Sequence, residues 1–310
     1  MKVIPVPPSL EERTFDQLVR ALGDAGPERL LLDARRLRWI DPYGMLGLLA
    51  VGERLQDAAQ RPILQLPESG EVTSYIARMG FFEHAEPFFE IHGTVRRPRG
   101  EKDSDVLLEI TPIREIEDVH RVVDHVHERA TTILHRQLGY TIAEAAQFSV
   151  VLSETCQNII EHAQAAGWVA TQTYSRTPQL DRRTVKIAVM DLGIGFKGSL
   201  ASTHAARHGD RWGDVAALES AFIHGMTRFH DPGRGQGLKQ IRRLVGRWGG
   251  KVSIRSGTAR IGDVPDWDDS PPLEEKLSPF PGAQIGIVLP ARVEAPQQAP
   301  AGAVTRGRRA

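Results

Sequence analysis

The stretch that decides the fold reads SETCQNIIEH over residues 153–162, DLGIG over residues 191–195 and GRGQGL over residues 233–238. The first motif places Glu154, Asn158 and Glu161 at spacings of four and three residues, which puts them on one face of a helix. The second follows a run of alternating apolar residues. The third has a glycine at every second position before a predicted helix. Each motif alone is common, so their order and spacing carry the prediction.

In this order the motifs resemble the N, G1 and G2 boxes of the GHKL (Bergerat-fold) ATPases, which include gyrase, mismatch-repair ATPases, histidine kinases and anti-sigma-factor serine kinases. The resemblance covers about residues 105–291 and implies ATP and Mg²⁺ as cofactors. It implies that Glu154 is the catalytic residue that accepts a proton from the attacking group or orients it. It also implies that Asn158 binds Mg²⁺ and that Asp191 accepts a hydrogen bond from the adenine amino group. The other implied nucleotide-binding residues are Gly193, Gly195, Gly233, Gly235, Gly237 and Leu238.

The residue types of the third motif suit phosphate binding. Alternating glycines let backbone N–H groups point at an anion, and the start of a helix adds its positive dipole. No Gly-Lys-Ser/Thr follows, so this is not a Walker A loop. Family members often have Gly-Thr before the last strand, but here the pair is Gly282-Ala283. The missing hydroxyl puts some nucleotide affinity in doubt.

The elements expected around these motifs alternate between helices and strands. Predicted helices cover residues 116–138, 142–166 and 216–224, and the stretch 231–239 is expected to open a further helix that runs to about residue 248. Predicted strands cover residues 106–110, 168–175, 184–190, 251–256 and 283–289. Cys156 falls on the apolar side of its helix and is expected to fill core space. Residues 197–232 are expected to form a lid. The acidic, Pro-rich residues 262–281 are expected to be a disordered or partner-binding insertion.

The amino-terminal part predicts helices over residues 10–22, 42–59 and 71–79, with strands over residues 30–32 and 62–66. Asp41 is the expected N-cap of the second helix, with Pro42 as its first residue. The pattern Asp41-x-x-Gly44-x-x-Gly47 after a strand resembles the turn of a STAS domain, the fold of anti-anti-sigma factors. That turn usually carries Asp-Ser-Ser-Gly and accepts phosphate on the second Ser. Here Tyr43 stands at that position, and an aromatic contact role for it is favoured over phosphorylation by another enzyme.

Together these patterns predict an α/β fold: a STAS-like α/β domain, then a Bergerat-fold α/β sandwich with helices on one face of a mixed sheet. The predicted boundaries are a STAS-like domain at 1–94, a linker at 95–105, an ATP-binding domain at 106–291 and a disordered tail at 292–310.

Composition narrows the classes of function. Lys+Arg and Asp+Glu are equal at 39 each, so no basic excess favours a nucleic acid or a membrane surface as partner. The single cysteine precludes an internal disulfide. No apolar run reaches the ~18 residues of a spanning helix, and the amino terminus does not resemble a signal peptide. A cytoplasmic protein is expected.

Three functions stay open: a serine/threonine protein kinase, an ATPase that switches partner binding, and a non-catalytic nucleotide-binding interaction protein. The combination of domains resembles the anti-sigma branch, which implies a protein partner such as a sigma factor, an anti-anti-sigma factor or another regulator, and allows a homodimer. The pair His127-Glu128 resembles a histidine-kinase phospho-acceptor box, but the proline expected after it is missing. A solvated helix face is favoured for that segment.

Overall fold

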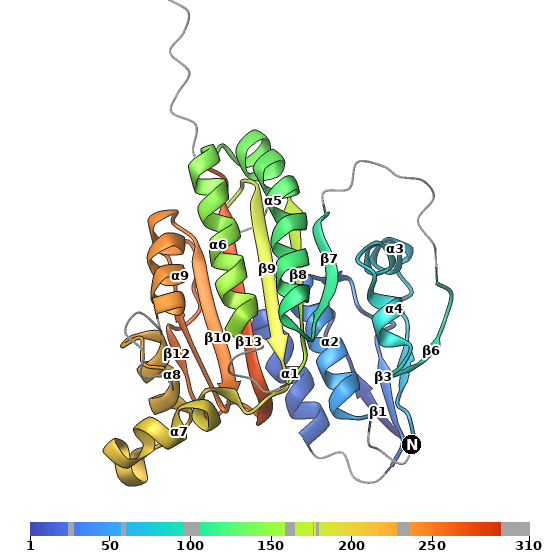
Figure 1. The fold of residues 1–310 in the computed structure, drawn as a ribbon. Coiled ribbons are helices and arrows are strands. Elements are labelled where there is room, and N and C mark those ends of the chain that lie inside the picture. The colour runs from blue at the N-terminus through green and yellow to red at the C-terminus, as the bar shows by residue number, and fades with distance from the viewer. Residues whose placement is uncertain are drawn as a thin grey trace, which may run out of the picture.

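The computed structural model describes residues 1–23, 28–56, 60–95, 106–158, 165–175, 177, 180–227 and 236–292. Helices are combined with a four-stranded sheet and a seven-stranded sheet (Figure 1), so the predicted α/β class is confirmed. We call residues 1–95 the N-terminal unit and residues 106–292 the C-terminal unit. The predicted domain boundaries stay a prediction, because residues 96–105 of the expected linker lie outside the described part.

The N-terminal unit contains a parallel sheet in the order β1-β3-β5-β6. Its strands are β1 (Lys2–Pro5), β3 (Leu30–Asp33), β5 (Ile63–Gln65) and β6 (Glu90–His92), and a short parallel pair joins β2 (Ser9–Leu10) to β4 (Trp39–Ile40). Its helices are α1 (Glu12–Gly23), α2 (Pro42–Arg54), α3 (Gly70–Arg78) and α4 (Phe81–Ala85). Parallel neighbours require crossovers, which these helices supply. The sequence predicted α1, α2, α3, β3 and β5 but missed the short elements.

The C-terminal unit contains a sheet in the order β12-β11-β10-β13-β9-β8-β7. The strands are β7 (Val106–Ile113), β8 (Gly167–Tyr174), β9 (Thr184–Asp191), β10 (Lys251–Gly257), β11 (Ala259–Asp263), β12 (Leu273–Glu274) and β13 (Phe280–Pro290). Every neighbouring pair is antiparallel. The expectation of a mixed sheet is therefore wrong, because its strands pair through hairpins and antiparallel returns rather than through parallel crossovers.

Three helices of the C-terminal unit cover one face of this sheet: α5 (Ile116–Leu138), α6 (Ile142–Asn158) and α9 (Gln236–Arg247). Apolar side chains of α6, Cys156 among them, share a core with Val185, Ile187 and Val189, which alternate along β9. Cys156 is fully buried, as the pattern predicted. The predicted helix 142–166 is shorter in the structure, since residues 165 and 166 are not helical.

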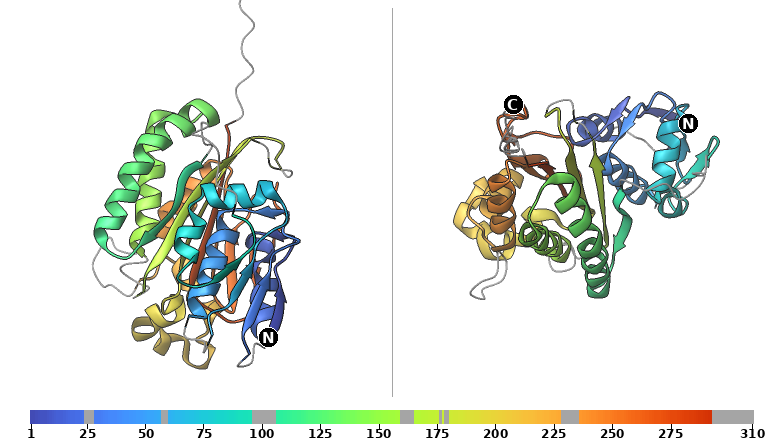
Figure 2. Two further views of the ribbon diagram at one scale, coloured as in Figure 1. Left: turned by 90° about the vertical axis from the view of Figure 1, so that its right-hand side faces the viewer. Right: turned by 90° about the horizontal axis from the view of Figure 1, so that it is seen from above.

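The opposite face of the sheet packs on the N-terminal unit (Figure 2), an arrangement that the sequence did not predict. Ala188 and Met190, which alternate with the residues facing α6, join the same core as α2. Helix α2 is buried along almost its whole length, as expected of a helix that is apolar all round. Its glycines allow close packing, because a Cβ on Gly44 would lie 2.1 Å from the Leu10 carbonyl oxygen.

Residues 262–281 are ordered, so the expectation of a disordered insertion is wrong. They complete β11, form β12 and run into β13. Asp268 accepts a hydrogen bond from Arg13 of α1 at 2.9 Å, and the Trp267 indole N–H donates to the Gly249 carbonyl at 2.8 Å. The acidic residues that suggested disorder thus pair with basic residues of the same chain.

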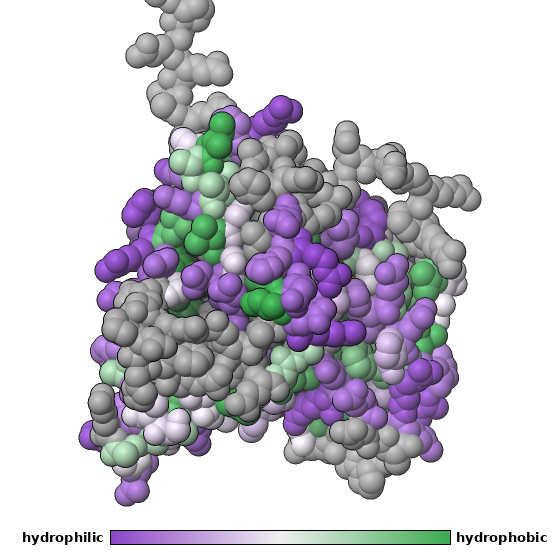
Figure 3. All heavy atoms as spheres, in the orientation of Figure 1, coloured by the Kyte–Doolittle hydropathy of each residue, from purple (hydrophilic) through white to green (hydrophobic). Residues whose placement is uncertain are grey.

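The face drawn in Figure 3 shows apolar side chains in small, separate patches among hydrophilic ones. Exposed apolar residues include Ile142 and Val150 of α6 and Ile116 of α5. Such scattered residues are ordinary at protein surfaces. Among the helices of the described residues, none is long and apolar enough to cross a membrane.

Candidate functional site

Asp191 ends β9 and is 5% exposed. Its Oδ1 accepts hydrogen bonds from the backbone N–H of Gly193 at 2.9 Å and of Ala283 at 3.3 Å. No described residue donates to the other oxygen, Oδ2. One oxygen is therefore fixed by the backbone while the other is left as an acceptor. This geometry suits the predicted hydrogen bond to an adenine amino group.

Burial raises the pKa of Asp191 from 3.8 to about 6, although the hydrogen bonds from Gly193 and Ala283 act in the opposite direction. The carboxyl group is therefore ionised at neutral pH and protonates in mildly acidic solution. An ionised acceptor makes a stronger hydrogen bond than a neutral one. Desolvation of this kind at a site with a free acceptor is typical of functional residues.

The backbone of β13 packs closely against Asp191. Gly282 has φ of +74°, and a Cβ there would lie 2.0 Å from the Asp191 carbonyl oxygen. The Ser256 hydroxyl donates to the Gly282 carbonyl at 2.8 Å and accepts from the Phe196 N–H at 3.1 Å. Gly195 also has positive φ, +63°, and a Cβ there would lie 2.6 Å from that hydroxyl oxygen. Two glycines thus let three chain segments meet beside the carboxylate.

The sequence did not point to Ser256 or Gln284, which help to hold this loop. The Gln284 side-chain amide donates to the Pro281 carbonyl at 2.8 Å and lies 3.5 Å from the Asp191 carbonyl. A signal did exist for Gly282, because Pro281-Gly282 is a turn dipeptide before a strand. Nothing in the sequence distinguishes Ser256 from other serines.

Glu154 lies on α6 and is partly buried, and its side chain makes no hydrogen bond or ion pair with another described residue. Gly237 lies in the first turn of α9, where a Cβ would be 2.5 Å from Oε2 of Glu154. The carboxylate therefore lies against the backbone at the start of α9. A helix start carries free N–H groups and a positive dipole, which favour anions. The structure thus brings together residues of the first and the third motif.

Several predicted site residues are placed only in part. Gly233, Gly235 and the side chain of Asn158 lie outside the described part, so the Mg²⁺ role of Asn158 stays a prediction. Leu238 is partly buried and packs on the core of the C-terminal unit, which anchors the start of α9. Among the described residues, no group of three or more His, Cys, Asp and Glu side chains could hold a metal ion.

The region expected to form a lid contains more helix than the sequence predicted. It holds α7 (Gly195–His208), the 3-10 turn η2 (Gly209–Arg211) and α8 (Asp214–Phe222). The predicted helix 216–224 corresponds to α8, while α7 was missed. Asp214 accepts hydrogen bonds from the N–H and hydroxyl of Thr258, which fixes α8 to the β10–β11 turn. Residues 228–232 of the expected lid lie outside the described part.

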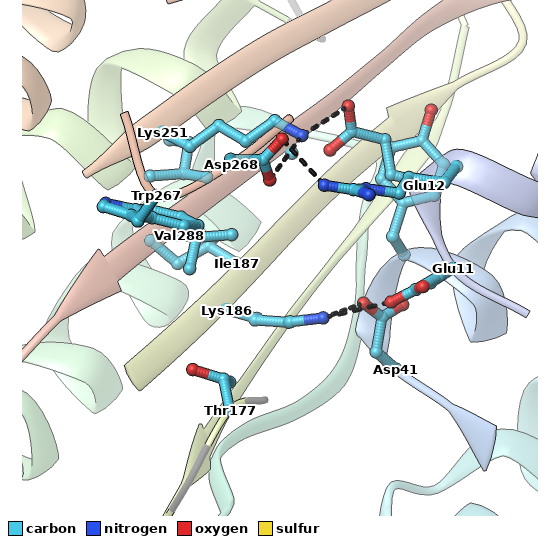
Figure 4. A pocket seen from close by; sticks show the side chains of 14 residues that line it. Glu11, Glu12, Asp41, Thr177, Lys186, Ile187, Lys251, Trp267, Asp268 and Val288 are labelled. Atoms are coloured by element: carbon cyan, nitrogen blue, oxygen red, sulfur yellow. Dashed lines mark hydrogen bonds and ion pairs between the residues drawn. The ribbon is translucent and has the colours of Figure 1, made fainter. Parts of the chain in front are cut away.

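The turn that resembles the STAS phosphorylation site is buried against the C-terminal unit beside a small charged cavity (Figure 4). Asp41 accepts from the Gly44 N–H at 3.0 Å, as predicted for the N-cap, and pairs with Lys186 of β9 at 2.9 Å. Burial lowers the pKa of Lys186, but Asp41 and Glu11 outweigh it and the pKa is raised. The interaction holds the turn against β9.

Tyr43 is 4% exposed and packs edge-on against Phe15 with ring centroids 5.8 Å apart. Its hydroxyl is buried and has no hydrogen-bond partner among the residues that the structure describes. The favoured interpretation as an aromatic contact residue is therefore confirmed. A kinase active site has no access to this hydroxyl in the folded chain.

The chain matches no protein-family model, and no match was found among curated proteins. Among solved structures it is similar to a histidine kinase domain from the Erythrobacter litoralis EL346 blue-light activated histidine kinase, at 11% sequence identity. The alignment covers 90% of this chain and 93% of that chain, with a TM-score of 0.25.

Proposed function

We propose that the chain is a Mg-ATP-binding regulatory protein that resembles anti-sigma-factor serine/threonine kinases and is fused to a STAS-like unit without the acceptor serine. One observation supports the proposal most strongly. Asp191 ends a central strand with one carboxylate oxygen held by two backbone amides and no described donor to the other. The contact of Glu154, from the first motif, with the start of α9, from the third motif, supports the same assignment.

Each residue has a distinct role in the proposed site. The Oδ2 of Asp191 accepts from the adenine amino group, and the amino end of α9 with its glycines binds the phosphates. Glu154 accepts a proton from the attacking group or orients it. Asn158 supplies an amide oxygen to Mg²⁺, a hard cation that neutralises phosphate charge when bound.

The proposed phosphate acceptor is a Ser or Thr of another protein, such as a sigma-factor regulator. The chain's own STAS-like turn is unsuitable, because it carries Pro42 and the buried Tyr43 where that family has serines. Two other functions use the same nucleotide site: an ATPase that switches partner binding and a binder that keeps ATP as structure. They differ from the kinase in where the γ-phosphate goes.

The deciding experiment follows the γ-phosphate. Purified chain is incubated with γ-labelled ATP and Mg²⁺, with and without a cell extract, and label is measured in protein and in free phosphate. Transfer to a protein of the extract supports the kinase, and release as free phosphate alone supports the ATPase switch. Tight binding by calorimetry with neither outcome supports the structural binder. Absence of any nucleotide binding would refute the proposal as a whole.

A further inference from the structure

A side chain of the N-terminal unit holds the loop that shapes the proposed adenine pocket. Asp16 of α1 accepts hydrogen bonds from the Ser278 backbone N–H at 2.9 Å and from Arg255 Nη2 at 3.1 Å. The same Arg255 nitrogen donates to the Ser278 carbonyl at 2.5 Å. Ser278, just before β13, is therefore held at both backbone groups: Asp16 binds its N–H and Arg255 binds its carbonyl.

Arg255 carries this contact further into the C-terminal unit. It is 2% exposed, and its guanidinium lies 5.7 Å from the ring centroids of both Phe15 and Phe280. Its Nη1 lies 3.4 Å from the side-chain oxygen of Gln284. Asp16 is its only carboxylate partner among the described residues. A buried guanidinium that loses such a partner is left uncompensated.

The far end of this network is the proposed adenine site. Gln284 is fully buried, and its amide donates to the Pro281 carbonyl and approaches the Asp191 carbonyl. Its neighbour Ala283 donates its N–H to Oδ1 of Asp191. The segment 278–284 is therefore held by Asp16 and Arg255 at one end and holds Asp191 at the other.

We propose that Asp16 and Arg255 are positioning residues for the nucleotide, through which the N-terminal unit sets the shape and the adenine selectivity of the pocket around Asp191. The inference rests on the proposed nucleotide function. It also has a mechanical consequence that holds without nucleotide: loss of Asp16 loosens segment 278–284. Neither residue is expected to touch ATP itself.

The test compares Asp16→Ala with Arg13→Gln. Arg13 is a matched control, because it also joins α1 to the C-terminal unit, through Asp268 and Asp269, but has no hydrogen bond to segment 278–284. Asp16→Ala is expected to weaken ATP binding about five- to tenfold and to lower the ratio of ATP to GTP affinity, as coupled neighbouring sites do. Arg13→Gln is expected to leave both within about twofold. Asp16→Asn, which keeps an acceptor for the Ser278 N–H, is expected to lie between wild type and Asp16→Ala, and replaces Asp16→Ala if that variant does not fold.

Hydrogen exchange of the nucleotide-free proteins separates this inference from the proposed function. Peptides covering residues 278–285 are expected to exchange faster in Asp16→Ala than in wild type, with no change in Arg13→Gln. Wild-type exchange in Asp16→Ala would overturn the inference even if ATP binds. Faster exchange in a protein that binds no nucleotide would refute the proposed function and leave the mechanical link standing. An equal loss of ATP and GTP affinity in both variants would also overturn the inference, because it indicates general destabilisation.

Discussion

Asp191→Asn isolates the contact on which the nucleotide assignment depends. Asn keeps an Oδ1 that accepts from the Gly193 and Ala283 amides, so the loop keeps its hydrogen bonds. It replaces the free Oδ2 with an NH₂ group that donates. An adenine amino group then meets a donor in place of a charged acceptor. The substitution therefore changes what the site presents to a ligand while it preserves the shape of the site.

The two expected effects have opposite signs. A lost hydrogen bond to a charged group, with a donor opposing a donor, costs about 3 kcal/mol or more, so ATP should bind about 100-fold more weakly. The pKa of Asp191 is raised from 3.8 to about 6 in the folded chain. At 1.36 kcal/mol per pKa unit this corresponds to about 3 kcal/mol of destabilisation while the group is charged. Asn carries no charge, so the variant should be at least as stable as wild type at pH 7.5, by up to about that amount.

The sign of the pH dependence follows from linkage. Between about pH 4 and 6 the folded state binds more protons at Asp191 than the unfolded state, so this group lowers stability as pH rises through that window. The stability advantage of Asp191→Asn should therefore shrink as pH falls from 7 towards 4. Wild-type ATP affinity should fall as pH drops below about 6, where the carboxylate protonates.

The assays are calorimetric titration with ATP and GTP and denaturant unfolding at several pH values. Asp124→Asn is a matched control, because Asp124 is exposed on α5, outside the proposed site, and its side chain has no hydrogen bond or ion pair with another described residue. ATP affinity within threefold of wild type in Asp191→Asn would refute the adenine contact. Loss of both affinity and stability at pH 7.5 would show that the carboxylate is structural and that the desolvation argument is wrong.

Three further predictions test other parts of the site. Glu154→Ala should keep ATP bound but slow γ-phosphate loss about 10²–10⁴-fold. Asn158→Ala should instead weaken Mg-ATP binding, because it removes the proposed metal ligand. If titration and phosphate-release assays showed the same effect for both variants, these separate roles would be contradicted. Gly282→Ala should destabilise the fold by more than 1 kcal/mol, roughly, and abolish ATP binding, because its Cβ would overlap the Asp191 carbonyl; wild-type unfolding curves would contradict this. Tyr43→Phe should be neutral or stabilising by about 1 kcal/mol, since it removes a buried hydroxyl that has no partner among the described residues. Mass spectrometry after incubation with Mg-ATP should find no phosphotyrosine at 43.

Periodic segments were predictable because one packing surface dictates them. Helix α5 has the predicted bounds, and Phe15, Leu18, Val19 and Leu22 face the core from α1 as their spacing indicates. The Asp41 cap was readable because it is local. Two parts of the fold were missed for different reasons. Helix α7 shows little apolar periodicity in the sequence. Residues 262–281 are ordered by contacts with α1 and β10, which lie far from them in the sequence.

In the candidate site, too, residues in local motifs were predicted, and residues that act through distant contacts were not. Asp191, Glu154 and Gly237 were identified from motifs, and the structure gives two of them a contact, the packing of Gly237 on Glu154. Ser256, Gln284 and Asp16 were not, because Ser, Gln and Asp occur on any surface and only pairing across distant strands gives them a role. The antiparallel sheet was missed for a similar reason, because strand direction is decided by partners rather than by local composition.

The shared core constrains how the N-terminal unit can act on the proposed nucleotide site. Helix α2 is buried between the two sheets, and Ala188 and Met190 of β9 belong to its core. Release of the unit would expose these apolar surfaces and one face of the seven-stranded sheet, which hydrophobic burial opposes. Lys186 and Arg255 would also lose the carboxylates that compensate them. Any influence of the unit on the proposed nucleotide site should therefore act while the unit stays docked, through contacts such as those of Asp16 and Arg255 with Ser278 in segment 278–284.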